Sequence, residues 1–187
     1  KGLEYFNTNF GPYQFKQFRI LEFPRYRTFA QSFPNTIPYS EGIGFIAHGT
    51  REDDLDIPFY VTGHELAHQW WGHQVIGHYA RGSNMLSESL AQYASLMVME
   101  KEVGPGNIRN YLKHELNRYL RGRGAERRKE EPLATVQRES YVWYQKGSLV
   151  FYALKDYMGE EQLNAALKKY VSRVKFQEPP YTNTTDF

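Results

Sequence analysis

Residues 1–50 lack the spacing of apolar positions that is typical of helices. Aromatic and aliphatic residues alternate or cluster there in short runs, such as Phe15–Phe23 and Gly42–Ala47. Prolines separate these runs, at Pro24, Pro34 and Pro38. The pattern predicts strands and turns, because alternating apolar positions suit a half-buried strand and proline interrupts it.

From Asp56 onward the apolar residues recur at helical spacing. Asp56-Ile57-Pro58 is typical of a helix start with proline in the first turn, and predicts one helix that includes Phe59–Ile76. Further helices are predicted at residues 84–103, 107–120, 139–157 and 160–174. Strands followed by helices indicate the α+β class. We therefore expect a single domain over residues 1–187, strand-rich over 1–55 and helical over 56–187.

The composition is that of a folded protein with a sizeable core. Of 187 residues, 41% are hydrophobic, and the formal net charge of +2 gives no reason to expect a nucleic-acid partner. The basic run Arg118–Lys129 is broken by glycines and Glu126, so it predicts a solvated helix end and loop rather than a binding patch. Cysteine is absent, which excludes disulfides, thiolate ligands and a cysteine nucleophile. No apolar run approaches the roughly 18 residues that span a bilayer.

The candidate chemistry lies in His64-Glu65-Leu66-Ala67-His68, an H-E-x-x-H pattern. Residues four apart share a helix face, so His64 and His68 can direct two imidazoles at one metal ion. Catalytic zinc takes three protein ligands and keeps one open position, and Glu88 is the candidate third ligand. Glu65 lies beside the pair, where it can act on a water molecule. The pattern predicts zinc-assisted hydrolysis, with a peptide bond as the expected target.

A structural interpretation of the same residues stays open. Thr62-Gly63-His64-Glu65 also fits a capping box, which would make Glu65 a helix cap instead of a base. The earlier helix start at Asp56 argues against this, because it places Glu65 inside the helix. Gly63 costs a helix roughly 1 kcal/mol relative to alanine, which suggests that another part of the chain approaches the backbone there.

Glu88 is predicted to face the two histidines from the following helix. The short connection over residues 77–83 predicts antiparallel packing of the two helices, which turns the start of the second towards the first. The alternative for Glu88 is a solvated helix carboxylate. Leu86 and Leu90 flank it in an apolar stripe, which favours the ligand role.

Four segments of the chain together resemble the aminopeptidase N family of zinc metallopeptidases, within the gluzincin clan. His64–Gly72 is similar to the family's zinc motif, and Leu86–Tyr93 to the segment with its acidic ligand. Tyr144–Gly147 resembles its Tyr-x-Lys-Gly segment, and Tyr39–Ile46 occupies the place of its Gly-x-Met-Glu-Asn segment. The segments follow the family's order and cover roughly residues 10–180, which makes the match specific.

The resemblance implies an α+β, thermolysin-like gluzincin catalytic domain with one zinc ion and peptide substrates. It implies His64, His68 and Glu88 as ligands, Glu65 as the general base, and Tyr144 as a hydrogen-bond donor to the oxyanion of the tetrahedral intermediate. The implied activity is that of an aminopeptidase. We expect the chain to be most of the catalytic domain, truncated at both ends, without the family's amino-terminal β domain and its later helical domain.

Glu41 is expected, with help from Glu88, to pair with the free α-ammonium group of the substrate. A strand predicted over Ile43–Ala47 would hold an extended peptide, and a carboxylate at its start would meet the peptide's amino terminus. The alternative for Glu41 is a solvated turn carboxylate between Pro38 and Gly42.

Three departures from the family pattern leave other functions open. Nineteen residues separate His68 from Glu88, one more than is usual in the family, although thermolysin-like gluzincins share this spacing. Ser87 and Ser89 flank Glu88 in place of Asn and Gly, and the Met-Glu-Asn core is reduced to Ser40-Glu41-Gly42. The alternatives are a gluzincin endopeptidase or other hydrolase, and a non-catalytic peptidase-like module of a larger protein, membrane-tethered or not.

The remaining histidines are not expected to bind the metal. His73 lies off the ligand face of an ideal helix, and His78 lies in the connection between the first two helices. His48 and His114 are expected to be surface or structural residues.

Overall fold

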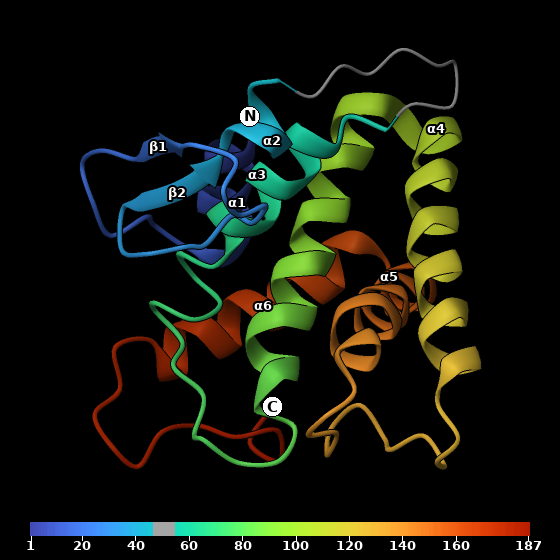
Figure 1. Ribbon diagram of the computed structural model, residues 1–187. Helices are drawn as coiled ribbons and strands as arrows, with labels where there is room; N and C mark the ends of the chain where they lie inside the picture. Colours follow the sequence, from blue (N-terminus) through green and yellow to red (C-terminus); the bar gives the residue numbers. More distant parts are fainter. Residues whose placement is uncertain (47–54) are drawn as a thin grey trace.

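The computed structural model describes residues 1–46 and 55–187. Two strands and a short helix form one end of the molecule, and longer helices make up the rest (Figure 1). In chain order the elements are α1 (Gly2–Phe10), β1 (Arg19–Phe23), β2 (Thr36–Ser40), α2 (Glu41–Gly44), α3 (Ile57–Ala67), η1 (Met85–Ser89), α4 (Leu90–Ala125), η2 (Val142–Lys146), α5 (Gly147–Met158) and α6 (Glu160–Val174). This order agrees with the predicted α+β class, although the sheet is small.

The sheet consists of two parallel strands. Residues Arg19 to Phe23 of β1 pair in register with Thr36 to Ser40 of β2. Pro38 lies inside β2, where the sequence predicted an interruption. Proline removes one ladder donor, which such a small sheet tolerates, and the Pro38 carbonyl still accepts a hydrogen bond from the Gln31 backbone N–H at 3.2 Å.

The amino-terminal residues form helix α1, so the prediction of strands and turns throughout residues 1–50 is wrong there. Phe6 and Phe10 are fully buried. They lie edge-on against Trp70 and Trp71, with ring centroids 5.5 Å and 5.2 Å apart. The helix is thus stabilised by aromatic contacts with a segment far along the chain.

The strand predicted over Gly42–Ala47, whose last residue lies outside the described part of the chain, is wrong at its start. Helix α2 occupies Glu41–Gly44 instead. Ser40 caps it: the Ser40 hydroxyl accepts a hydrogen bond from the Gly42 backbone N–H at 3.3 Å and donates to the Arg27 carbonyl at 2.7 Å. These bonds turn the chain into a helix directly after β2.

Helix α3 begins as predicted but ends at Ala67, not at Ile76. The Asp56 carboxylate accepts a hydrogen bond from a backbone N–H of the first turn at 2.9 Å, so Asp56 is the cap and the capping-box role considered for Glu65 is wrong. Gly72 has a φ of 135°, which favours glycine and is incompatible with a continuous helix. The chain therefore leaves the helix soon after the second histidine.

Helices α3 and α4 approach each other closely at Gly63. A Cβ atom at this position would lie 2.9 Å from the Ser95 Oγ atom and 3.6 Å from the Ser95 Cα atom. The Ser95 hydroxyl donates a hydrogen bond to the Tyr60 carbonyl. The suggestion that another part of the chain approaches the backbone at Gly63 is confirmed, and this contact limits the distance between the two helices.

The predicted helices at 84–103 and 107–120 form one bent element. Helix α4 kinks at Gly104, where φ is 80° and ψ is 165°, directly before Pro105. Proline removes a backbone donor and prevents a continuous helix, so the predicted stop is confirmed. The bend directs the second half of α4 on a separate course beside α5 (Figure 1).

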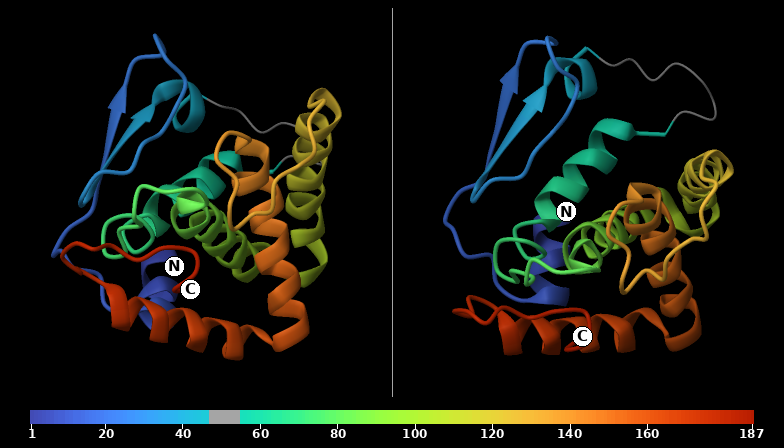
Figure 2. Two further views of the ribbon diagram at one scale, coloured as in Figure 1. Left: turned by 90° about the horizontal axis from the view of Figure 1, so that it is seen from below. Right: turned by 60° about the horizontal axis from the view of Figure 1, so that its bottom comes forward.

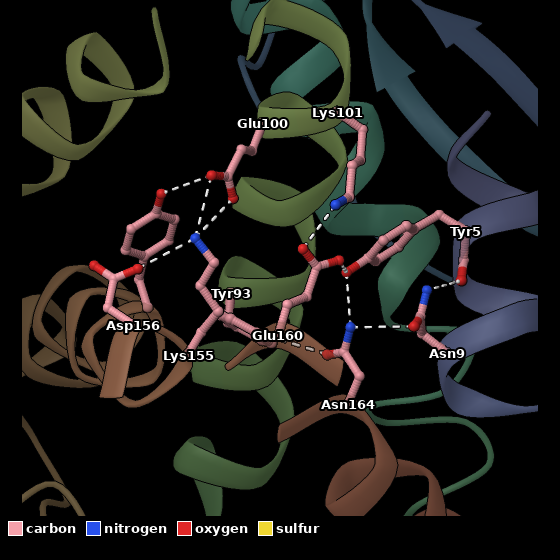
Figure 3. Close-up of polar contacts among 10 residues, drawn as sticks. Tyr5, Asn9, Tyr93, Glu100, Lys101, Lys155, Asp156, Glu160 and Asn164 are labelled. Carbon is pink, nitrogen blue, oxygen red and sulfur yellow. Dashed lines mark hydrogen bonds and ion pairs between the residues drawn. The ribbon is translucent and has the colours of Figure 1, made fainter. Parts of the chain in front are cut away.

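Helix α6, whose bounds match the predicted helix at 160–174, runs across one side of the molecule beside α1 (Figure 2). A polar network joins α6 to α1 and α4 (Figure 3). The Tyr5 hydroxyl donates to Glu160 at 2.9 Å and accepts from the Asn164 amide at 2.9 Å. Tyr93 of α4 donates to Asn164 at 3.2 Å. Within the described residues, no helix combines the length and apolar character needed to cross a membrane.

Candidate metal centre and the pocket beside it

His64, His68 and Glu88 converge on one point. The Nε2 atoms of the two histidines lie 3.1 Å apart, and each lies 3.3 Å from the Glu88 Oε2 atom. Two imidazole nitrogens and a carboxylate oxygen are thus close enough to bind a single ion. All three side chains are largely shielded from solvent, so an ion there would be held in a partly dry environment.

The last turn of α3 sets the directions of the two imidazoles. His68 is the residue that ends the helix, and it still has helical φ and ψ of −60° and −17°. Its backbone N–H bonds to the His64 carbonyl at 3.2 Å, which preserves the four-residue spacing on one face. The prediction that His64 and His68 share a helix face therefore holds, although the helix stops sooner than predicted.

The turn after α3 fixes the ring of His68. The Nδ1 atom of His68 lies 2.8 Å from the Trp71 carbonyl oxygen. A carbonyl can only accept, so this bond places a proton on Nδ1 and leaves the Nε2 lone pair for a metal. Trp70 and Trp71 are fully buried, and the Trp70 indole donates to the Gly11 carbonyl at 2.8 Å. Burial of the tryptophans thus holds the carbonyl that orients His68.

Glu88 reaches the histidines from η1, the π-helical turn before α4. Burial alone would raise the pKa of the Glu88 carboxyl, but His64 and His68 outweigh burial and hold that pKa well below its usual range. Burial likewise opposes charge on His68, yet Glu88 raises the pKa of His68 overall. The carboxylate is therefore ionised at neutral pH, as a metal ligand must be.

The donor set fits zinc. Two imidazole nitrogens with one carboxylate oxygen is a combination found in catalytic zinc sites, and it leaves a coordination position open. The buried Oε2 atom of Glu88 has no hydrogen-bond partner within the described residues, and the same is true of the Nδ1 atom of His64. A cation between the three groups would satisfy the Glu88 oxygen.

Glu65 and Tyr144 face the same centre from two elements. Glu65 lies on α3 next to His64, is almost fully buried, and lines a pocket together with His64 and Tyr144. The Tyr144 ring on η2 lies 5.8 Å from the His64 ring, measured between centroids. Burial, the Glu88 carboxylate and Glu65 raise the pKa of Tyr144 well above its usual range. The Tyr144 hydroxyl therefore keeps its proton and can donate a hydrogen bond.

The two π-helical turns that hold Glu88 and Tyr144 touch each other. The Ser89 hydroxyl donates a hydrogen bond to the Trp143 carbonyl at 2.6 Å. A Cβ atom on Gly147 would lie 2.6 Å from the Ser89 Cβ atom, so only glycine fits at that position. Single π-helical turns inside longer helices are frequent at functional sites. Here they bring Glu88 and Tyr144 to one point.

Glu41 is placed differently from the strand start that was predicted. It is the first residue of α2, which packs against α3, and its Oε1 atom accepts a hydrogen bond from the Arg25 backbone N–H at 2.9 Å. It is not among the residues that line the pocket beside the histidines. The role of Glu41 towards a substrate amine stays a prediction.

The pocket also brings in residues that the sequence did not single out. Besides His64, Glu65 and Tyr144, it is lined by Ile57, Tyr60, Val61, Gln92, His114, Arg118 and Gln145. Arg118 belongs to the run that was assigned to a solvated helix end. Its four-residue spacing from His114, one turn along the same helix face, was the available sequence signal.

The other histidines do not join the metal centre within the described residues. His73 lies in the turn after α3, where burial and then His68 lower its pKa. His78 lies in the connection before η1, and its backbone N–H bonds to the Thr182 carbonyl at 2.6 Å. His48 lies outside the described residues.

The sequence matches a known peptidase family along its whole length. The family described as "Peptidase family M1 domain" matches residues 1–187. Endoplasmic reticulum aminopeptidase 2 of Homo sapiens is 26% identical over 126 residues, which is 63% of this chain and 13% of that protein.

Solved structures with the same fold include the M1 zinc metallopeptidase of Deinococcus radiodurans. It has a TM-score of 0.67 and 24% identity, and the match covers 92% of this chain and 35% of that chain. A mutant of that enzyme bound to a Tyr-Ser-Ala substrate has a TM-score of 0.66 at 24% identity, over 93% of this chain and 36% of that one. At this identity the likeness establishes the fold. The chain spans well under half of each relative.

Removal of Glu88 tests the metal centre directly. We expect Glu88→Ala to weaken zinc binding by more than about 100-fold, because loss of an outer hydrogen-bond partner alone typically weakens it 10- to 100-fold. Competition with a chromogenic chelator measures the zinc affinity. Glu161→Ala, which changes an exposed glutamate on α6, is the control and should bind zinc as the parent does. Equal affinity of the Glu88 variant and the parent would exclude Glu88 as a ligand.

Proposed function

This chain belongs to peptidase family M1, and on that premise we propose that it is a zinc-dependent aminopeptidase that hydrolyses the amino-terminal bond of peptides. The proposal rests above all on the convergence of His64, His68 and Glu88 beside Glu65 and Tyr144. The name of its human relative, an aminopeptidase, points the same way. We further propose that residues 1–187 form part of one catalytic domain.

His64, His68 and Glu88 would hold the zinc ion. When bound, zinc polarises a carbonyl group and makes water a stronger nucleophile at neutral pH. The protein's part is to hold the ligands in their correct protonation states. The Trp71 carbonyl holds the proton of His68 on Nδ1, and the two histidines keep Glu88 ionised.

Glu65 is the general base in this proposal. It takes the proton of the attacking water and passes it to the amine that leaves. Its position suits this role, because it lines the pocket beside His64. Its near-complete burial limits access of bulk solvent to the carboxylate.

Tyr144 stabilises the oxyanion of the tetrahedral intermediate. A preorganised donor aimed at developing negative charge is among the largest contributions to catalysis. The raised pKa of Tyr144 keeps its hydroxyl protonated across the neutral range, so it acts as a donor. The contact of η2 with η1 through Ser89 holds Tyr144 beside Glu88 before any substrate binds.

Glu41, with Glu88, would pair with the substrate's free amino group and so define an exopeptidase. One observation favours a second candidate function, that of an endopeptidase. The Glu41 carboxylate already accepts a hydrogen bond from the Arg25 backbone, and it does not line the pocket. If this bond persists when substrate is bound, the amine has no anchor there, and an endopeptidase of the same family is the alternative.

The general base is tested by Glu65→Gln. We expect turnover of a peptide substrate to be lost, because the amide cannot accept the proton of water. Zinc affinity and melting temperature should stay near those of the parent, since Glu65 is neither a ligand nor a cap. Chelator competition and thermal unfolding measure these two quantities. Retained turnover with a large fall in melting temperature would reverse the assignment.

The oxyanion role is tested by Tyr144→Phe. We expect kcat to fall by roughly 10²–10³, the cost of removing one oxyanion donor, while KM changes little. The control is Tyr141→Phe on the same segment, because Tyr141 does not line the pocket and its loss should leave kcat unchanged. If both variants match the parent in kcat, the oxyanion is stabilised by another group.

Exopeptidase specificity is tested with a pair of peptides that differ only by an acetyl group on the amino terminus. We expect the parent to cleave the free-amine peptide and to reject its acetylated twin. Glu41→Ala should raise KM for the free-amine peptide and narrow this preference, whereas Glu22→Ala on exposed β1 should not. Cleavage of both peptides by the parent would favour the endopeptidase.

A further inference from the structure

A pocket of about 210 Å³ opens directly beside the candidate metal centre. His64, Glu65 and Tyr144 line it, so a substrate held for hydrolysis would extend into it. Its other lining residues come from the start of α3, both halves of α4 and η2. The volume suits one short side chain or the end of a small peptide, since pockets for larger ligands start at about 300 Å³.

The second half of α4 is fixed against α3 at this pocket. The Asp56 backbone N–H donates a hydrogen bond to the Tyr111 hydroxyl at 2.8 Å, and the Tyr60 and Tyr111 ring centroids lie 5.4 Å apart. His114 and Arg118 follow Tyr111 on this helix, and both line the pocket. The backbone that carries the cationic side chain of Arg118 is therefore held in place by these contacts.

The charge of Arg118 is not neutralised by an ion pair within the described residues. Two other arginines have carboxylate partners. Arg81 lies 2.8 Å from Glu131, and Arg123 lies 3.9 Å from Glu130. No carboxylate comes within such a distance of the Arg118 guanidinium in residues 1–46 and 55–187.

Nearby titratable groups leave Arg118 as the main positive charge of this wall. Glu115 is fully buried and accepts a hydrogen bond from Gln92 at 3.2 Å. Burial, only partly offset by Arg118, raises the pKa of the Glu115 carboxyl and makes its charge less favourable. Burial, Arg118 and Arg121 lower the pKa of His114, so His114 is neutral at neutral pH.

We propose that Arg118 binds a carboxylate group of the substrate, so that the enzyme favours peptides with a carboxylate close to the bond that is cleaved. This inference rests on the proposed peptidase function. A guanidinium group matches a carboxylate with two parallel hydrogen bonds, and a carboxylate is the negatively charged group that peptides contain. Two sources share this chemistry: an acidic side chain next to the scissile bond, and the terminal carboxylate of a dipeptide.

The polar residues that line the pocket agree with a carboxylate as the ligand of Arg118. Glu65 is the acidic residue of its lining, and it belongs to the catalytic end. The other polar lining residues include the neutral amides Gln92 and Gln145. A lysine or arginine side chain would meet Arg118 without a compensating carboxylate at that wall, and like charges repel.

The test compares kcat/KM for matched substrates in the parent, Arg118→Ala, Arg118→Glu and Arg121→Ala. Glu-Ala-Ala-amide against Gln-Ala-Ala-amide tests an acidic first residue, and Ala-Glu-Ala-amide against Ala-Gln-Ala-amide an acidic second one. Ala-Ala against Ala-Ala-amide tests the terminal carboxylate. We expect the parent to favour the carboxylate in at least one pair by about 10- to 100-fold, the range for a hydrogen bond to a charged group.

Arg118→Ala should lose this preference, and Arg118→Glu should favour Lys-Ala-Ala-amide or Ala-Lys-Ala-amide over the acidic peptides. Arg121→Ala, which removes an arginine outside the pocket lining, should keep the parent's preference. Parent activity without a carboxylate preference, or a preference that survives in Arg118→Ala, would overturn the inference and leave the proposed function intact.

If no peptide is hydrolysed, the proposed function fails, and titration calorimetry of the same pairs then decides the role of Arg118. Tighter binding of the carboxylate peptide by the parent, lost in Arg118→Ala, would uphold the binding role. Equal binding within every pair would refute it.

Discussion

The site depends on one constraint, which is that three lone-pair atoms must be held within about hydrogen-bond distance of one another. The two Nε2 atoms of His64 and His68 lie 3.1 Å apart and face the same oxygen of Glu88 at 3.3 Å. Lone pairs in this arrangement repel one another unless a cation or a proton lies between them. The surrounding fold must therefore hold these atoms together against their repulsion. It does so where α3 and α4 cross closely at Gly63.

Two features of the packing set the relative positions of the proposed catalytic groups. The buried indoles after α3 stop the helix and present the Trp71 carbonyl to the second histidine. The hydrogen bond from Ser89 to Trp143 joins the turn with Glu88 to the turn with Tyr144. A change in either feature would therefore alter the relative positions of catalytic groups without touching any of them.

The sequence predicted the local chemistry better than the course of the chain. The four-residue spacing of His64 and His68 fixes their common face wherever the helix ends, so the premature end at Ala67 did not disturb that prediction. The end itself depends on where two tryptophans are buried, which is a tertiary property. Helix α1 was missed for the same reason, since its aromatic face is stabilised by those tryptophans. The α6 helix, with its apolar spacing and clear boundaries, was predicted at its observed bounds.

Arg118 shows why a local charge pattern is a weak guide to function. In the sequence it begins a basic run, and the solvated position predicted for such a run agrees with its exposure. Its place beside the catalytic groups follows from the kink at Gly104, which gives the second half of α4 its own direction, and from the contact of Tyr111 with the start of α3. The kink is local in sequence, but the contact of Tyr111 joins residues 55 positions apart. The lining thus combines Glu65, next to the proposed zinc ligand His64, with the guanidinium of Arg118. Under the proposed function, a substrate of matching polarity would be oriented by both charges before cleavage, because attraction and repulsion at two points exclude the reversed pose.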